Sequence, residues 1–100
     1  MIDNVSDYVS DYVMNNFLPS DQDAASRELD CFGYCMMQAI EHVANNRFDK
    51  AAAYHENAAR SLRALSKMKK ANDQARFIIG QLNSNRDQII LISKMVKQNE

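Results

Sequence analysis

Four basic side chains recur at helical spacing in the second half of the 100-residue chain. Arg60, Arg63, Lys67 and Lys70 are three, four and three positions apart, which places them along one face of a helix. Lys69 and Arg76 widen this basic stripe. A stripe of this kind faces water, an acidic protein surface or phosphate groups, and we rank these interpretations in that order. Nucleic acid ranks third because no aromatic residues are interleaved for stacking on bases.

Two cysteines and two histidines form a second group of side chains with chemical potential. Cys31 and Cys35 lie four positions apart on one helix face, and His42 continues that face seven positions later. His55 lies on the next predicted helix. Cysteine and histidine are the usual zinc ligands, but these spacings match no common zinc motif. We therefore interpret the cysteines as small core residues, and we predict no metal and no cofactor.

Motifs of catalytic sites are absent from the sequence. It contains no glycine-rich phosphate loop, no HExxH pair and no CxxC motif. Glu41 and His42 are adjacent, as are His55 and Glu56, and adjacent residues do not share a helix face. The sequence therefore predicts a protein that is not an enzyme, and an enzyme or metal protein built on Cys31, Cys35 and His42 ranks last.

The composition predicts one all-α domain over residues 1–100. The chain has 46% hydrophobic and 25% charged residues, one proline and two glycines, with twelve alanines and no threonine. These values exclude disordered, disulfide-rich and β-sandwich classes. No apolar stretch approaches the length of a membrane span, and the acidic N-terminus differs from a secretory signal, so we expect a cytoplasmic protein. The net charge of −1 gives no overall bias towards nucleic acid or membrane, although the acids gather in residues 1–30.

Apolar periodicity and breaking residues divide the chain into four predicted helices. They cover approximately residues 4–17, 21–45, 48–70 and 72–97 and are expected to pack as a small antiparallel bundle. Pro19 ends the first helix, and Ser20 is expected to cap the second. Asn45 and Asn46 supply the next turn, and Asn72 or Asp73 is expected to cap the fourth helix. Residues 1–17 are expected to form an N-terminal helix that detaches from the bundle or exchanges between chains.

The second and third predicted helices are expected to pack closely as a hairpin. A turn near residue 46 places Ala39 opposite Tyr54, Cys35 opposite Ala58 and Cys31 opposite Leu62. Gly33 inside the second helix indicates a close helix crossing or, alternatively, a local break.

The segment from residue 39 to residue 62 resembles known helical hairpins. It has Ala39, then Phe48-Asp49-Lys50-Ala51 after the turn, then Ala58. This pattern is similar to one tetratricopeptide-type hairpin and equally to the second and third helices of a microtubule-interacting-and-trafficking domain. The resemblance implies recognition of a peptide or helix in a groove. No second copy follows at a spacing of about 34 residues, so a repeat array is excluded.

The last predicted helix carries a heptad seam with a surplus of apolar residues. Residues 75, 78, 82, 85, 89, 92 and 96 are spaced alternately three and four apart, and Asn85 is the polar member that can define register. The run from Ile89 to Ile92 is apolar on every side, which requires burial in more than one direction. Either the first helix covers it or a second chain does. We favour the second chain, with a self-association surface formed by Leu82, Asn85, Ile89, Ile90, Ile92 and Val96.

These observations predict a non-enzymatic protein–protein interaction module of the adaptor, chaperone or inhibitor type. It would present helix faces to a partner, form a homodimer through the last helix, and bind an acidic partner through Arg60, Arg63, Lys67 and Lys70. The alternative is a small regulatory protein that contacts nucleic acid through the same basic stripe.

Overall fold

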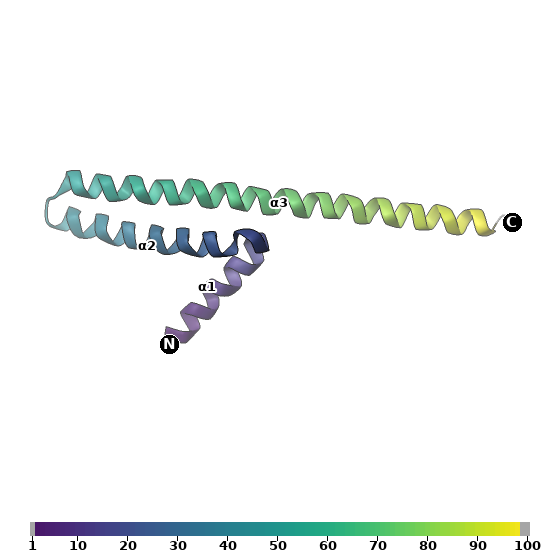
Figure 1. Ribbon diagram of the computed structural model, residues 1–100, viewed down its shortest axis with the longest axis horizontal. Coiled ribbons are helices and arrows are strands. Elements are labelled where there is room, and N and C mark those ends of the chain that lie inside the picture. Colours follow the sequence, from purple (N-terminus) through teal and green to yellow (C-terminus); the bar gives the residue numbers. More distant parts are fainter. Residues whose placement is uncertain (1, 99–100) are drawn as a thin grey trace.

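A computed structural model of the chain is all-α, as the composition predicts (Figure 1). It describes residues 2–98, with side chains from Val9 to Lys97. Helix α1 spans Ile2–Asn16, the short 3-10 helix η1 Pro19–Asp21, α2 Gln22–Ala44 and α3 Phe48–Gln98. Helices α2 and α3 run antiparallel, and α1 lies at an angle to them beside the start of α2 (Figure 1).

Helix α3 is far longer than the helix that packs against it. It has 51 residues against 23 in α2, so its second half extends beyond the rest of the molecule (Figure 1). The described chain is 82 Å long and 19 Å thin, with a radius of gyration of 22.2 Å. A compact 100-residue domain has a radius of about 13 Å. Half of α3 therefore lacks the packing that a globular fold provides.

The predicted four-helix antiparallel bundle is wrong, because the third and fourth predicted helices form the single helix α3. The break expected at Asn72 and Asp73 is absent, and neither residue caps a helix. No proline or glycine lies between residues 70 and 73, and asparagine costs only a few tenths of a kcal/mol within a helix. An ion pair between Lys69 and Asp73, four positions apart, also spans the expected break and supports the helix there.

The other two predicted breaks are confirmed. Leu18, before Pro19, is extended with φ −60° and ψ 148°, because a residue before proline is disfavoured in the helical region. Asp21 rather than Ser20 precedes α2, and its side chain makes no capping hydrogen bond, so the cap predicted at Ser20 is wrong. Asn46 has φ 60°, the left-handed conformation that asparagine tolerates and that reverses the chain between α2 and α3.

Most of the buried residues in the interface between α2 and α3 have small side chains. The buried residues on the two helices are Ala25, Cys35, Ala39, Ala51, Ala58, Ser61, Leu65 and Asn72. Cys35, Ala39 and Ala58 are therefore in the interface as predicted, whereas Cys31 and Leu62 are exposed. The close crossing and the local break proposed at Gly33 are both wrong: α2 is continuous, and an added Cβ there would meet nothing within 4 Å.

The largest buried side chains lie where the three helices meet. Val13, Phe17, Ala25 and Leu65 form this junction core, and Leu29 and Met68 pack against it. Tyr12 adds an edge-on ring contact to Phe17, with centroids 6.2 Å apart. Helix α1 is therefore attached to the hairpin mainly by its last turn and the residue that follows it.

Replacing Asn72 by leucine is expected to stabilise the protein. The side chain is 6% exposed, and its amide nitrogen has no hydrogen-bond partner among the described residues. A buried polar group without a partner costs about 1–3 kcal/mol, and leucine has the same number of side-chain heavy atoms and the same branching without that cost. We expect the free energy of unfolding in urea to rise by about 1–2 kcal/mol.

The matched control is Asn57→Leu, at an exposed position of the same helix. It should change stability by less than about 0.5 kcal/mol. A loss of stability in Asn72→Leu would contradict the prediction and would show that the amide is satisfied by an ordered water or a rearranged neighbour.

Candidate interaction surface

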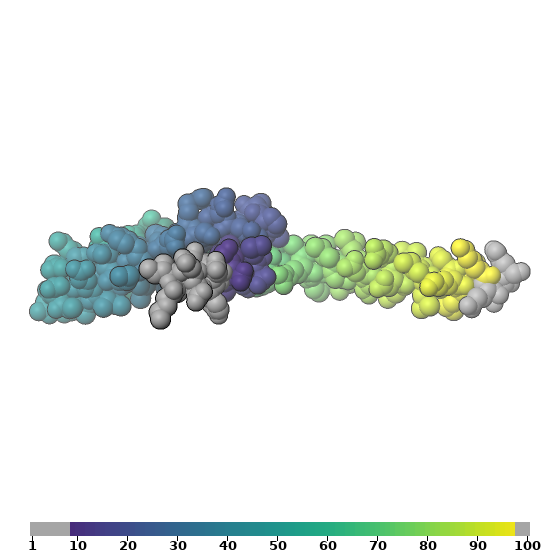
Figure 2. All heavy atoms as spheres, turned by 90° about the horizontal axis from the view of Figure 1, so that it is seen from below, coloured from purple at the N-terminus to yellow at the C-terminus, as the bar shows by residue number. Residues whose placement is uncertain are grey.

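The free part of α3, residues 77–97, is called the arm. Every side chain in the arm is exposed. Figure 2 shows it as a rod one helix wide that leaves the packed part of the molecule. Helix α1 lies beside α2 and does not cover the arm, so the first of the two alternatives for its apolar run is wrong (Figure 1). The structure thus places all six predicted self-association residues on one uncovered segment.

The exposed side chains of the arm are large and apolar. Leu82 is 62% exposed, Ile89 63% and Ile92 59%. Further exposed apolar residues of the arm are Phe77, Ile78, Ile79, Ile90, Leu91, Met95 and Val96. An apolar surface of this extent is unusual on a monomeric protein. Asn85, the polar member of the predicted seam, is exposed among them.

The basic stripe lies on the side of α3 turned away from α2. Arg60, Arg63, Lys67 and Lys70 are all exposed. The acidic residues of the first helix make it a candidate partner for this stripe, within one chain or between two, but within the chain α1 contacts α2 at the junction, and the side chains of Asp3 and Asp7 lie outside those described. Among the residues whose side chains are described, the four members of the stripe are therefore accessible to solvent.

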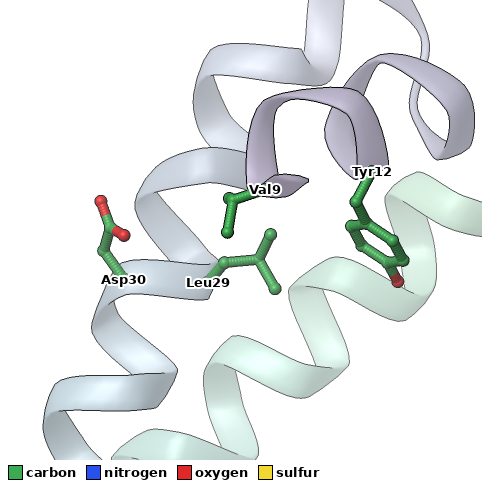
Figure 3. Close-up of a pocket in the computed structure, with 4 residues that line it drawn as sticks. All are labelled: Val9, Tyr12, Leu29 and Asp30. Carbon is green, nitrogen blue, oxygen red and sulfur yellow. The ribbon is translucent and has the colours of Figure 1, made fainter. Parts of the chain in front are cut away.

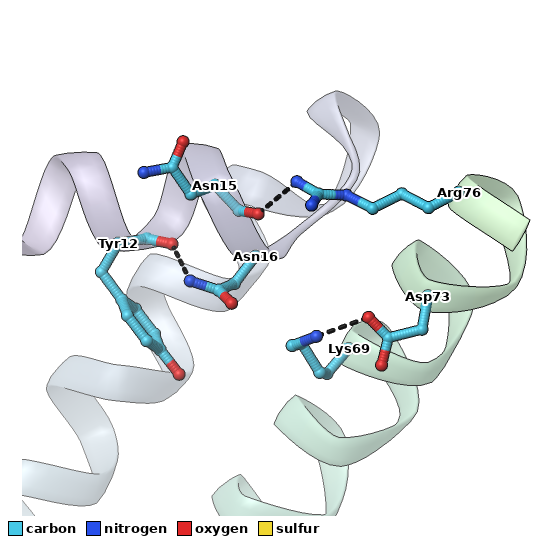
Figure 4. A network of polar contacts seen from close by, with 6 residues as sticks. All are labelled: Tyr12, Asn15, Asn16, Lys69, Asp73 and Arg76. Carbon is cyan, nitrogen blue, oxygen red and sulfur yellow. Dashed lines mark hydrogen bonds and ion pairs between the residues drawn. The ribbon is translucent and has the colours of Figure 1, made fainter. Parts of the chain in front are cut away.

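Two residues expected to widen the stripe have other partners (Figure 4). Lys69 pairs with Asp73 along α3. Arg76 donates from Nη2 to the carbonyl oxygen of Asn15, 2.6 Å away. This carbonyl belongs to the last turn of α1, where unpaired backbone oxygens favour a cation. Arg76 thus connects α3 to α1. The sequence alone did not indicate this role, because Arg76 and Asn15 are 61 positions apart and meet only when the two helices pack together.

A shallow hollow lies between α1 and α2 (Figure 3). Val9, Tyr12, Leu29 and Asp30 line this space of about 290 Å³. In Figure 3 the side chain of Val9 points from α1 towards Leu29, the Tyr12 ring lies on the other side of Leu29, and the Asp30 carboxylate is turned away from them. The hollow is mainly apolar and belongs to the edge of the junction core.

The cysteines and histidines occupy separate environments. The sulfur atoms of Cys31 and Cys35 are 3.9 Å apart, and both thiols are free. Burial raises the pKa of the Cys35 thiol, with a smaller contribution from the neighbouring Cys31. The His42 ring stacks on Tyr54 with centroids 5.3 Å apart, and its Nδ1 accepts a hydrogen bond from Arg47. Within the described residues, no group of three histidine, cysteine or acidic side chains is arranged to hold a metal ion.

Two findings concern the chain as a whole. Among residues 2–98, none of the helices has an apolar stretch long enough to cross a bilayer. Comparisons with protein-family models, curated proteins and solved structures give no match to this chain.

Proposed function

We propose that the protein is a non-enzymatic protein–protein interaction module of the adaptor, chaperone or inhibitor type, with the arm as its binding surface. The observation that carries this proposal is the complete exposure of the large apolar side chains of residues 77–97. The cytoplasmic location and the homodimer predicted from the sequence stay part of it. The hairpin made by α2 and the first half of α3 serves as the scaffold from which the arm projects.

The physical basis is the removal of apolar surface from water. Fully covering one exposed isoleucine or leucine contributes about 1.5–3 kcal/mol, and the arm offers several at helical spacing. A partner helix is the natural occupant, because side chains three and four positions apart form a stripe that another helix can pack against. The resemblance of residues 39–62 to helical binding modules agrees with recognition of a helix.

The basic stripe is proposed as a second, weaker surface for an acidic protein. Its support is the exposure of its four side chains and their alignment on one face of α3. Exposed ion pairs contribute about 0–1 kcal/mol each, so the stripe would guide a partner more than hold it. The nucleic-acid alternative is supported by the same exposure of the four basic side chains and by no further feature of the described residues.

Capture from a lysate with matched variants tests the proposed function. The immobilised wild-type chain, an Ile89→Asp/Ile92→Asp variant and an Arg60→Glu/Arg63→Glu variant are incubated with nuclease-treated lysate, and bound proteins are quantified by mass spectrometry. We expect a near-stoichiometric protein with the wild type and the arginine variant and at least a tenfold loss with the isoleucine variant. Circular dichroism checks that both variants remain helical.

Two results would contradict the proposal. Equal recovery of the same protein by the isoleucine variant would show that the arm is not the binding surface. Recovery of only nuclease-sensitive material, lost in the arginine variant and weakened steeply by salt, would support the nucleic-acid alternative instead.

A further inference from the structure

We propose that the arm of a second copy of this chain covers the arm, running antiparallel to it and continuing the line of α2. This inference rests on the proposed function, because it names the occupant of the same surface. Each α3 would then be packed along its whole length, by its own α2 in the first half and by the partner copy's arm in the second.

The first argument is continuity with the interface that already exists. One row of residues recurs every seven positions through both halves of α3: Ser61, Met68, Ala75, Leu82, Ile89 and Val96. Ser61 is buried and Met68 and Ala75 are half-buried in the packed half, whereas the last three are exposed in the arm. A seven-residue repeat is the pattern of helices that wind around each other. Helix α2 covers the first part of this row, and the row continues along α3 beyond the N-terminal end of α2.

The second argument is the symmetry of the arm about its own centre. Leu82 and Ile89 are equally distant from the midpoint between residues 85 and 86, and so are Ile79 and Ile92, and Ala75 and Val96. The segment between them, residues 83–88, is entirely polar. In an antiparallel pair centred on this midpoint, the members of each of these three pairs meet each other, and the polar segment meets itself. A shift of one heptad would instead place Arg86 of the polar segment against Ile92 or, in the other direction, against Ile78, so the position of this segment defines the register.

The third argument is the space around the arm. The start of α2, η1 and the end of α1 lie where the arm begins, as Figure 1 shows. A parallel pair would bring two such assemblies together at one end, whereas an antiparallel pair places them at opposite ends. The arm is about 30 Å long at 1.5 Å per residue, close to the length of the 23-residue α2. The partner copy's arm thus fits the uncovered length as α2 fits the first half.

Light scattering and distance measurements between spin labels test the arrangement. The full chain carries Cys31→Ser and Cys35→Ala, so that a nitroxide attaches only to an introduced cysteine, either Gln74→Cys or Lys97→Cys. Light scattering from 1 to 500 µM should show twice the monomer mass at the high end, and Ile89→Asp/Ile92→Asp should remain monomeric. Each label lies 11.5 positions from the midpoint, so pulsed electron resonance should give about 35 Å between the two labels of the antiparallel dimer for both variants.

The possible outcomes separate this inference from the proposed function. A label distance below about 20 Å at Lys97→Cys would mean a parallel pair and would overturn the antiparallel arrangement. A monomer at every concentration would overturn the second copy as occupant, while the lysate capture would still decide whether the arm binds another protein. A dimer that persists in Ile89→Asp/Ile92→Asp would show that the copies meet elsewhere.

Discussion

Replacing Phe17 by alanine is expected to lower the free energy of unfolding by about 3–5 kcal/mol. The ring is 3% exposed and lies in the junction core with Val13, Ala25 and Leu65. Removing it deletes most of the aromatic volume in that core and the contact with Tyr12. Because small domains have only about 5–15 kcal/mol in total, this single change removes a large share of the stability.

Urea denaturation followed by circular dichroism measures this effect, with Phe48→Ala as the matched control. Phe48 begins α3 at the hairpin turn and is 62% exposed, so the same truncation there should cost less than about 1 kcal/mol. Similar losses in the two variants would mean that the junction core does not hold α1 to the hairpin. Because residues 1–17 are predicted to detach from the hairpin, we also expect Phe17→Ala to release α1.

Enlarging Ala58 to leucine is the second change with a large expected effect. Ala58 is 1% exposed, in an interface where alanine, cysteine and serine supply most of the buried residues. Three added carbon atoms force α2 away from α3 or push the leucine into an unfavourable rotamer. Overpacking of this kind costs about 1–3 kcal/mol and sometimes more when the surrounding helices are close.

The control for this variant is Ala53→Leu, on the exposed side of the same helix. Leucine and alanine have similar helix propensities, so we expect a change within about 0.5 kcal/mol. Thermal unfolding of the two variants side by side should show a lower midpoint for Ala58→Leu alone. Equal midpoints would contradict the close approach of α2 and α3.

Local chemistry explains the parts of the fold that could be predicted from the sequence. Pro19 restricts the residue before it, and Asn46 tolerates a positive φ, so both helix breaks follow from properties of single residues. The spacing of Cys35 and Ala39 likewise indicated the face that α2 buries. In each case the information lies within a few neighbouring positions.

The errors arose where the outcome depends on distant parts of the chain. Asn72 has the propensity of a helix cap, but the continuous helix on both sides and the Lys69–Asp73 pair outweigh that preference. Arg76 was placed in the basic stripe because its contact with Asn15 exists only in the folded chain. Among the candidate site residues, exposure of the arm was anticipated from its surplus of apolar side chains, whereas its projection beyond α2 was not.

The unsupported length of α3 divides the backbone hydrogen bonds into two classes. Bonds opposite α2 break only when the hairpin opens, whereas those of the arm can break one turn at a time from its free end, because most helical stability in proteins comes from tertiary packing and the arm has none. Covering the arm would then order the chain as it binds, at a cost of about 1–2 kcal/mol for each backbone residue that it fixes. Part of the energy from apolar contact would be consumed by this ordering, so the complex would bind less tightly than its area suggests and would dissociate readily. Amide exchange in the arm would then depend on protein concentration, so that helix formation and assembly become one equilibrium.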